Sequence, residues 1–269
     1  MLTRRPRPKL RRLAINAELC GLVQYRLDKR WSPEQISNSL RVEQPDRLDL
    51  HLAPESIYQA IYEPLSVLTT SPRVALRTGR MNRRRRRAGT GSSRFVVPMT
   101  PIKQRPEVVV DRVEGGHWEG DLITGTMNQS AIGTLVERSS RFTILVHFIG
   151  THDAEQLRDS MTEIFNQLPA SVRRSLTWDQ GIEMARHHEF TAATTMPVYF
   201  CEPRSPWQRG TNENTNGLLR QYFPKSTDLS VYSIEDLQHV ADELNDRPRK
   251  TLGWRTPATV FASLKLTTV

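Results

Sequence analysis

The sequence predicts an α/β protein in which a mixed five-stranded sheet, with helices on both faces, follows a small all-α region. Two observations predict the sheet: three strand-like runs follow one another closely after residue 117, and strand-like and helix-like runs alternate beyond them. A third observation, a set of short amphipathic patterns before residue 63, predicts the helical region. A chain of 269 residues suits one large domain and a smaller one.

The helical region contains three expected helices. Apolar residues recur at helical intervals over 9–29, with arginines between them. Ser32 and Gln35 have the spacing of a capping box, with proline at the first helical position, which begins a helix to about Leu40. A further helix is expected over 54–62. Such a set is typical either of a DNA-binding helix-turn-helix or of a bundle that supports a neighbouring domain, and spacing alone does not choose between them.

Residues 64–106 are rich in Pro, Gly, Ser and Arg, which is typical of a linker. They include the run Arg83, Arg84, Arg85, Arg86 and Arg87. Such a run is either disordered and solvated, or it neutralises the phosphates of a nucleic acid and adds affinity without sequence information.

The distribution of charge favours nucleic acid as a partner of the N-terminal part. The whole chain has a net charge of +9, but residues 1–105 hold 22 Lys and Arg against 8 Asp and Glu, while the remainder holds 16 against 21. A basic region followed by an acidic body is the expected pattern when the first part binds nucleic acid.

The core is expected to begin with three strands, over 117–125, 130–137 and 142–149. Helices and strands should then alternate: a helix over 153–168, a strand over 175–179, a helix over 182–194, a strand over 197–201 and a helix over 212–222. Short connections join the first three strands, so they should form an antiparallel meander, and the later alternation should add parallel strands. If the first and fourth strands are neighbours, Asp121 and Asp179 lie close together.

Three carboxylates have informative positions. Asp121 lies inside an apolar run that suits a strand, where Asp is depleted, and Asp179 follows another strand. Glu213 is expected in the first turn of a helix that Thr211 or Asn212 caps. Each has an ordinary structural explanation, such as a turn or a favourable interaction with the helix dipole. Together they supply oxygen ligands of the kind that Mg²⁺ prefers.

Longer motifs surround these carboxylates. They are Gly-His-Trp-Glu-Gly-Asp-Leu-Ile, Thr-Trp-Asp-Gln-Gly and Ser-Pro-Trp-Gln-Arg-Gly-Thr-Asn-Glu-Asn-Thr-Asn-Gly-Leu-Leu-Arg-Gln-Tyr-Phe-Pro-Lys. With the spacing of 33 residues between Asp179 and Glu213, they resemble the bacterial insertion-sequence-thirty family of DDE transposases, over most of the chain. The resemblance implies a ribonuclease-H-like integrase catalytic core that cleaves DNA ends and transfers strands.

The same resemblance implies a set of site residues, cofactors and partners. Asp121, Asp179 and Glu213 would be the catalytic and metal-binding residues, for two Mg²⁺ ions that Mn²⁺ can replace. Double-stranded DNA, as transposon ends and as target, would be the partner, and the protein would be a homo-oligomer when assembled on DNA.

Basic residues accompany the third carboxylate. Arg209 and Arg220 share a helix side with it and resemble the basic residues that flank the Glu in many DDE transposases, although the expected tyrosine before them is Pro206 here. Together with Lys225 they are expected to contact DNA, with ordinary solvated side chains as the alternative. Glu183 is the alternative ligand if the third carboxylate is only a cap.

We therefore expect a helix-turn-helix-like region over 1–63, a basic linker over 64–106, the catalytic core over 107–225, and a C-terminal helix and basic tail over 226–269 packed on the core. Alternatives remain for the function. One is a catalytically silent or N-terminally shortened protein that binds transposon ends as a regulator, because similar transposases begin with a further helix-turn-helix segment. Another is a nuclease that cuts DNA but does not join it.

Cysteine usage and hydropathy predict a cytoplasmic protein associated with the nucleoid. Cys20 and Cys201 are far apart and match no metal-binding or redox spacing, so we expect buried or idle thiols in a reducing compartment. The sequence contains neither an apolar run of membrane-spanning length nor a secretory signal.

Overall fold

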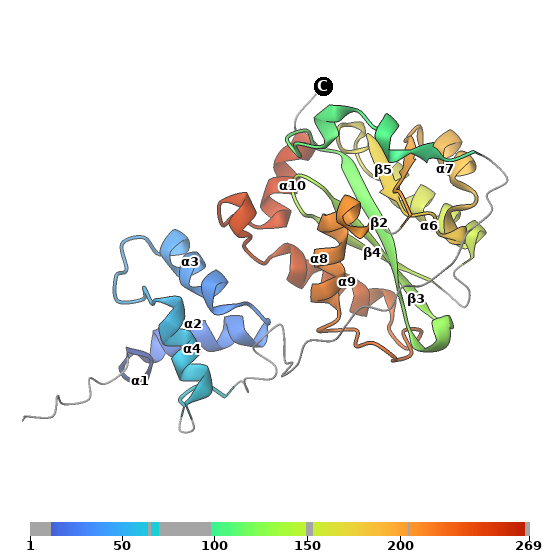
Figure 1. Cartoon of the computed structure of the whole chain (residues 1–269). Coiled ribbons are helices and arrows are strands. Elements are labelled where there is room, and N and C mark those ends of the chain that lie inside the picture. Colours follow the sequence, from blue (N-terminus) through green and yellow to red (C-terminus); the bar gives the residue numbers. More distant parts are fainter. Residues whose placement is uncertain (1–11, 64–65, 70–97, 149–152, 204, 267–269) are drawn as a thin grey trace, which may run out of the picture. The chain divides into compact units, whose positions relative to one another are not determined.

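The structure is a computed structural model that describes residues 12–63, 66–69, 98–148, 153–203 and 205–266. The chain divides into two compact units, shown in Figure 1. The first unit contains the described residues before Arg85 together with Pro248–Trp254, and the second contains the remaining described residues. The arginine run at 83–87 lies outside the described residues.

The N-terminal unit contains the helices α1 (Arg12–Ile15), α2 (Ala17–Asp28), α3 (Pro33–Glu43) and α4 (Pro54–Tyr62). They pack around one apolar cluster to which all four contribute. The prediction of a single helix over 9–29 is wrong, because the chain breaks at Asn16, whose side chain accepts a hydrogen bond of 2.9 Å from the amide of Leu19 and so caps α2.

The capping box that begins α3 is confirmed. Ser32 Oγ accepts from the amide of Gln35 at 3.3 Å, and Gln35 Oε1 accepts from the amide of Ser32 at 2.9 Å. The connection from α3 to α4 spans residues 44–53, whereas the turn of a helix-turn-helix usually has about three or four residues. The α3–α4 connection is therefore longer than the turn usual for that DNA-binding motif.

Part of the C-terminal tail belongs to the N-terminal unit. Gln35 Nε2 donates to the carbonyl of Pro248 at 2.8 Å, and Lys250 forms an ion pair of 3.0 Å with Glu34. The sequence predicts the tail on the core, but Pro248–Trp254 packs against α3 because the polar groups of that helix supply its partners.

The core unit is built on a mixed sheet with the strand order β1-β6-β5-β2-β3-β4. Its strands are β1 (Thr100–Pro101), β2 (His117–Thr124), β3 (Ala131–Glu137), β4 (Thr143–His147), β5 (Ser175–Trp178) and β6 (Val198–Phe200). The expected meander is confirmed, since β2, β3 and β4 are antiparallel neighbours. The first and fourth core strands, β2 and β5, are parallel neighbours, which is the condition under which Asp121 and Asp179 were expected to lie close together.

The described sheet has six strands and not the predicted five, because the short β1 pairs in parallel with β6. Thr100 lies opposite Tyr199 and Pro101 opposite Phe200 in this pairing. Both residues of β1 fall in the segment that the sequence assigns to the linker.

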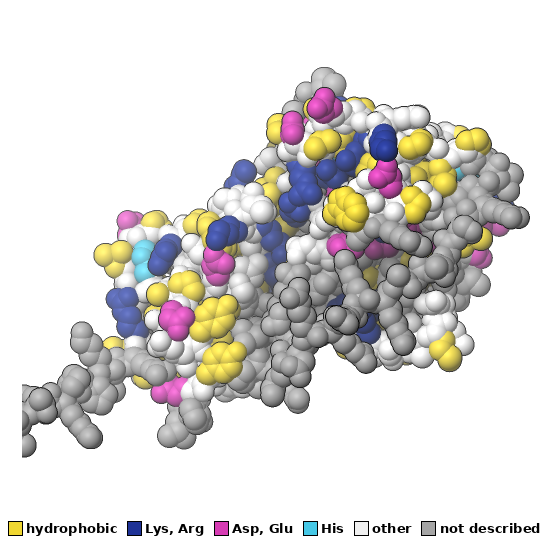
Figure 2. All heavy atoms as spheres, viewed as in Figure 1, with side chains coloured by type: hydrophobic (Ala, Val, Ile, Leu, Met, Phe, Trp, Pro, Cys, Tyr) yellow, Lys and Arg dark blue, Asp and Glu magenta, His cyan; other side chains and the backbone are white. Residues whose placement is uncertain are grey.

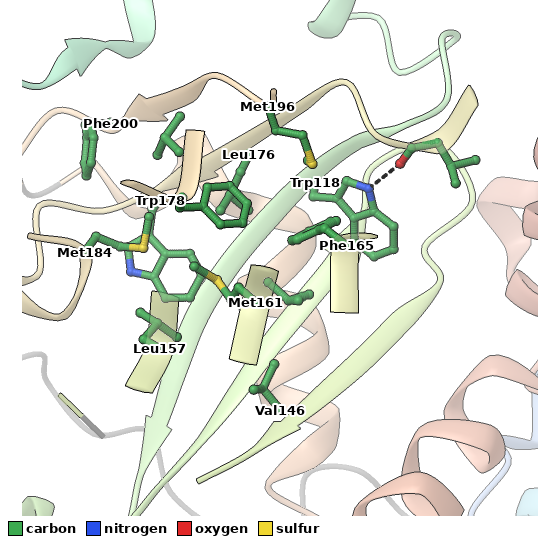
Figure 3. Close-up of a cluster of buried hydrophobic side chains, with 14 of the residues drawn as sticks. Trp118, Val146, Leu157, Met161, Phe165, Leu176, Trp178, Met184, Met196 and Phe200 are labelled. Carbon is green, nitrogen blue, oxygen red and sulfur yellow. Dashed lines mark hydrogen bonds between the residues drawn. The ribbon is translucent and has the colours of Figure 1, made fainter. Parts of the chain in front are cut away.

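Helices cover both faces of the sheet, as predicted (Figure 1). One face packs against α6 (Ala154–Asn166), α7 (His187–Thr194) and α10 (Pro257–Leu266). Figure 3 shows its centre, where the Trp118 ring lies edge-on to Phe165 at 5.3 Å and its indole donates to the carbonyl of Val172 at 2.8 Å. The expected helix 182–194 is divided, since a 3-10 turn over Ile182–Met184 precedes α7.

The other face packs against α8 (Gly210–Leu219) and α9 (Ile234–Asn245). Ile123 from β2 and Ile132 from β3 meet Leu218, Leu219 and Leu244 in this second cluster. Because side chains alternate along a strand, the β2 residues that share the face of Ile123 include Glu119 and Asp121. None of the helices within the described ranges combines the length and the hydropathy of a membrane span.

The two thiols should differ in reactivity. Both cysteines are free, and burial raises the pKa of Cys201 to about 11, whereas Cys20 is partly exposed. At about pH 8 only about one Cys201 side chain in a thousand is then a thiolate, the reactive form. We expect iodoacetamide to modify Cys20 at least tenfold faster than Cys201, as measured by peptide mass spectrometry. Denatured protein is the control, and similar rates in the folded protein would contradict the burial of Cys201.

Candidate active site

Asp121 and Asp179 lie on the same face of the sheet. Asp121 is in β2 on the side that α8 covers. In the parallel pairing of β2 with β5, Glu119 lies opposite Thr177, and Asp179 follows directly after the end of β5. The side chain of Asp121 is 24% exposed and that of Asp179 is 42% exposed.

Arg209 links the two aspartates. Its Nη1 lies 3.1 Å from Asp121 Oδ1 and its Nη2 lies 3.0 Å from Asp179 Oδ2. Nη1 also donates to the carbonyl of Gly120 at 2.7 Å. Arg209 is only 7% exposed, so the guanidinium that the sequence assigns to DNA is instead enclosed between two carboxylates. The physical reason is charge compensation, since two neighbouring carboxylates in a partly buried site repel each other.

Further hydrogen bonds fix the carboxylate of Asp121. Oδ1 accepts from the amide of Leu122 and Oδ2 accepts from Asn216 Nδ2, both at 2.9 Å. Burial raises the pKa of Asp121, and the positive charge of Arg209 opposes that shift. Asn216 Oδ1 is buried and accepts no hydrogen bond from the described residues. Asn216 was not among the predicted site residues, although its position one helical turn beyond Glu213 was a usable signal.

Asp179 begins a tight turn that also holds Glu183. Asp179 Oδ1 accepts from the amide of Gly181 at 2.9 Å, and Glu183 Oε1 accepts from Trp178 Nε1 at 3.0 Å. A Cβ atom at Gly181 would lie 2.1 Å from that Glu183 oxygen, so any larger residue at this position would displace the Glu183 carboxylate. Burial raises the pKa of Glu183. The indole of Trp178 thus orients Glu183, the alternative to Glu213 as third carboxylate.

Glu213 lies in the first turn of α8 with an exposed side chain. The expected caps are wrong: Thr211 and Asn212 both lie inside the helix, which begins at Gly210 directly after a 3-10 turn over Pro206–Arg209. Their amides donate instead to the carboxylate of Glu119 in β2. The helix ends at Leu219 and not at the predicted Tyr222.

One side of α8 follows β2. Arg209 donates to Gly120, Asn216 donates to Asp121, and Arg220 Nη2 donates to the carbonyl of Thr124 at 3.2 Å. Glu213 is four residues after Arg209 and three before Asn216, so its backbone lies on this same side of the helix.

The three predicted carboxylates are not gathered around one point. Within the described ranges, no three His, Cys, Asp or Glu side chains lie close enough together to hold a metal ion. The structure therefore brings Asp121 and Asp179 together around Arg209, and it places Glu213 on the side of α8 that follows β2, with an exposed side chain.

The other predicted DNA-contact residues have different surroundings. Lys225 is exposed after the end of α8, and Arg220 is partly buried against backbone carbonyls. Figure 2 shows further Lys and Arg side chains of the core unit on the face that it presents, with Asp and Glu side chains near them.

Comparison with known proteins identifies the family. The Integrase core domain family matches residues 111–206, which include Asp121 and Asp179. The transposase for insertion sequence element IS1086 of Cupriavidus metallidurans is 50% identical over 254 residues, 94% of this chain and 75% of that protein. Transposase InsI for insertion sequence element IS30A of Escherichia coli is 47% identical over 264 residues, 97% of this chain and 68% of that protein. The chain belongs to the insertion-sequence-thirty family of transposases.

The integrase core match and the mixed sheet of this transposase confirm the predicted ribonuclease-H-like α/β fold. A solved structure, the catalytic core domain of BIV integrase, aligns with 55% of this chain and 95% of that chain, with a TM-score of 0.42 and 16% identity. The match to the integrase core ends before α8, so Glu213 lies outside it.

Proposed function

We propose that this transposase cleaves DNA at the ends of its insertion sequence and transfers the freed strands to target DNA. Asp121, Asp179 and Glu213 are the proposed catalytic carboxylates. The observation that best supports this site is the pair of aspartates from parallel strands that share one positive group, the Arg209 guanidinium, at 3.1 and 3.0 Å. Two neighbouring carboxylates repel each other unless a cation compensates their charge. Carboxylate oxygens are the ligands that hard divalent ions such as Mg²⁺ prefer.

The residues present fit Mg²⁺, with Mn²⁺ as a substitute. The proposed ligands are all carboxylate oxygens, and the buried Asn216 Oδ1 accepts no hydrogen bond from the described residues, so this oxygen is available to an ion or to the donating hydrogen of a bound water. We propose that the exposed side chain of Glu213 turns towards Asp121 when an ion binds. We propose that these three carboxylates hold two ions.

Bound Mg²⁺ would supply activation of the attacking oxygen and stabilisation of the leaving oxygen. The residues of the chain set the geometry for this chemistry. Leu122 and Asn216 orient the carboxylate of Asp121, and the turn at Gly181 orients that of Asp179. Water attacks in cleavage and a DNA 3′-hydroxyl attacks in strand transfer, so no side chain needs to form a covalent bond with DNA.

We further propose that the N-terminal helices over 1–63 and the basic linker over 64–106 bind double-stranded DNA. The supporting observation is the net charge of +14 over 1–105, with the linker run from Arg83 to Arg87. Arg220 and Lys225 would contact DNA beside the core over 107–225, and α9 and α10 in 226–269 complete the core. A homo-oligomer assembled on DNA is part of the same proposal.

A strand-transfer assay tests the proposed function. The purified chain is incubated with labelled insertion-sequence ends, a target plasmid and Mg²⁺, and the products are separated on denaturing gels. We expect nicks at the ends and joined products. Nicks without joined products would instead identify a nuclease. Binding without either product, in Mg²⁺ and in Mn²⁺, would identify a DNA-binding regulator and overturn the proposal.

A further inference from the structure

A carboxylate of β2 caps the helix that contains Glu213. The helix α8 lacks a cap of its own, because its N-cap residue, Arg209, makes no side-chain capping bond. The first amides of a helix need acceptors from outside the helix. Glu119 Oε2 accepts from the amides of Thr211 and Asn212, both at 2.9 Å.

Glu119 is fully buried, with no exposed surface. A buried carboxylate is costly unless it is paired and fully hydrogen-bonded. Its Oε1 forms an ion pair with Arg138, which is 4% exposed and also donates to the carbonyl of Val109 at 3.1 Å. The positive end of α8 adds a second favourable interaction. The negative charge of Glu119 is therefore directed at the start of α8.

A second set of contacts fixes the same turn. Asn212, also fully buried, donates from Nδ2 to the carbonyls of Glu119 and Thr134, both at 3.0 Å, and its Oδ1 accepts from Thr134 Oγ1 at 3.0 Å. The residue that follows is Glu213. Because Glu119 and Asp121 are separated by two positions on one strand, the same stretch of β2 presents Asp121 and fixes the beginning of α8.

We propose that Glu119 is a positioning residue for Glu213: its buried carboxylate sets the start of α8 so that Glu213 can act with Asp121. The proposal rests on the proposed function, in which Glu213 is a metal ligand. Glu119 is the Glu of the motif His-Trp-Glu-Gly-Asp and is not one of the three proposed catalytic carboxylates. The proposal gives this residue a role in the site. A purely stabilising role of the Glu119–Arg138 pair is the alternative.

Mn²⁺ binding to the full chain, measured by titration calorimetry, separates these roles. Replacement of a group that orients a metal ligand typically weakens metal affinity by about 10–100-fold. We expect Glu119→Gln to weaken Mn²⁺ binding by about tenfold or more. We also expect faster hydrogen exchange of the amides of Thr211 and Asn212. In a Glu213→Gln background, Glu119→Gln should have no further effect on Mn²⁺ affinity, because both changes act through the same ligand.

Glu137→Gln is the matched control. Glu137 is also a fully buried carboxylate, but it accepts from the amides of Gly116 and Ser140 and does not contact α8. Its replacement should lower the melting temperature without changing Mn²⁺ affinity or the exchange of the α8 amides. If Glu119→Gln and Glu137→Gln change Mn²⁺ affinity equally, Glu119 is only a stabilising residue and the inference is wrong.

Two further outcomes keep this inference separate from the proposed function. If Glu213→Gln leaves Mn²⁺ affinity unchanged, the proposed ligand set fails. If Glu213→Gln weakens Mn²⁺ binding but Glu119→Gln does not, only the inference fails. Should Glu119→Gln not fold, Glu119→Asp replaces it: this variant keeps the charge, but its shorter side chain does not reach the amides of α8, so the same loss of Mn²⁺ affinity is expected.

Discussion

Asp121→Asn is expected to abolish both DNA cleavage and strand transfer while DNA binding stays nearly unchanged. The amide keeps the shape of the side chain but removes a charged oxygen ligand. Loss of one electrostatic group that stabilises a transition state typically lowers the rate by about 10²–10³-fold, and we expect at least that for each of Asp121→Asn, Asp179→Asn and Glu213→Gln. Single-turnover cleavage of labelled ends, with binding measured by fluorescence anisotropy, checks this result.

Asp228→Asn is the control, because Asp228 is an exposed aspartate whose carboxylate accepts hydrogen bonds from Ser230 in its own turn. It should leave both reactions intact. The triple variant should be little worse than any single one, since ligands of one site act as a unit. If Glu213→Gln retains strand transfer, the third ligand is not Glu213. Glu183, next to Asp179, would then be the residue to replace.

The sequence predicts the neighbourhood of the two aspartates because that part of the fold follows general rules. Consecutive strands with short connections pair in antiparallel order, and strands that follow crossover helices pair in parallel. These rules fix the directions of the strands but leave open whether the strand of Asp121 neighbours that of Asp179, and the structure shows that it does. Local chemistry likewise predicts the capping box of α3, in which all the partners lie within four residues.

The parts that the sequence does not predict depend on contacts between distant residues. The acceptor that caps α8 comes from Glu119, which is more than ninety positions away, so no local pattern indicates it. The strand β1 has only two residues and is defined by its pairing with β6. Two residues are too few to show the alternation of apolar and polar side chains that predicts a strand. Arg209 forms ion pairs with Asp121 and Asp179. These two aspartates are neighbours only in the folded sheet, so the sequence does not predict that Arg209 lies between them.

Arg209→Gln should destabilise the metal-free protein. Removal of one partner from a fully buried ion pair typically costs about 3–5 kcal/mol, whereas exposed pairs contribute about 0–1 kcal/mol. Asp121 is 24% exposed and Asp179 is 42% exposed, so solvent screens part of the interaction. We therefore expect a loss of about 1–3 kcal/mol in the free energy of unfolding in EDTA, measured by urea denaturation. Arg220→Gln is the matched control, since the contacts of Arg220 on the same side of α8 are to backbone carbonyls.

The effect of Arg209→Gln should depend on pH in a defined direction. Burial already raises the pKa of Asp121 above its ordinary value, and Arg209 opposes this shift, so the replacement raises that pKa further. A carboxyl group with a raised folded-state pKa binds more protons in the folded protein, and stability then falls as pH rises through the interval between the unfolded and folded values. The variant should therefore lose more stability, relative to the wild type, at about pH 8 than at about pH 5.

Divalent ions should reverse this loss. If the two aspartates bind Mg²⁺, the ion supplies the positive charge that Arg209→Gln removes, and any ligand that binds only the folded state stabilises it in proportion to the logarithm of its concentration. Added Mg²⁺ should then raise the melting temperature of Arg209→Gln more than that of the wild type, in which the guanidinium competes for the same carboxylates. Equal shifts in both proteins, or a stability of Arg209→Gln in EDTA equal to that of Arg220→Gln, would show that Arg209 does not act as the counter-ion of this site.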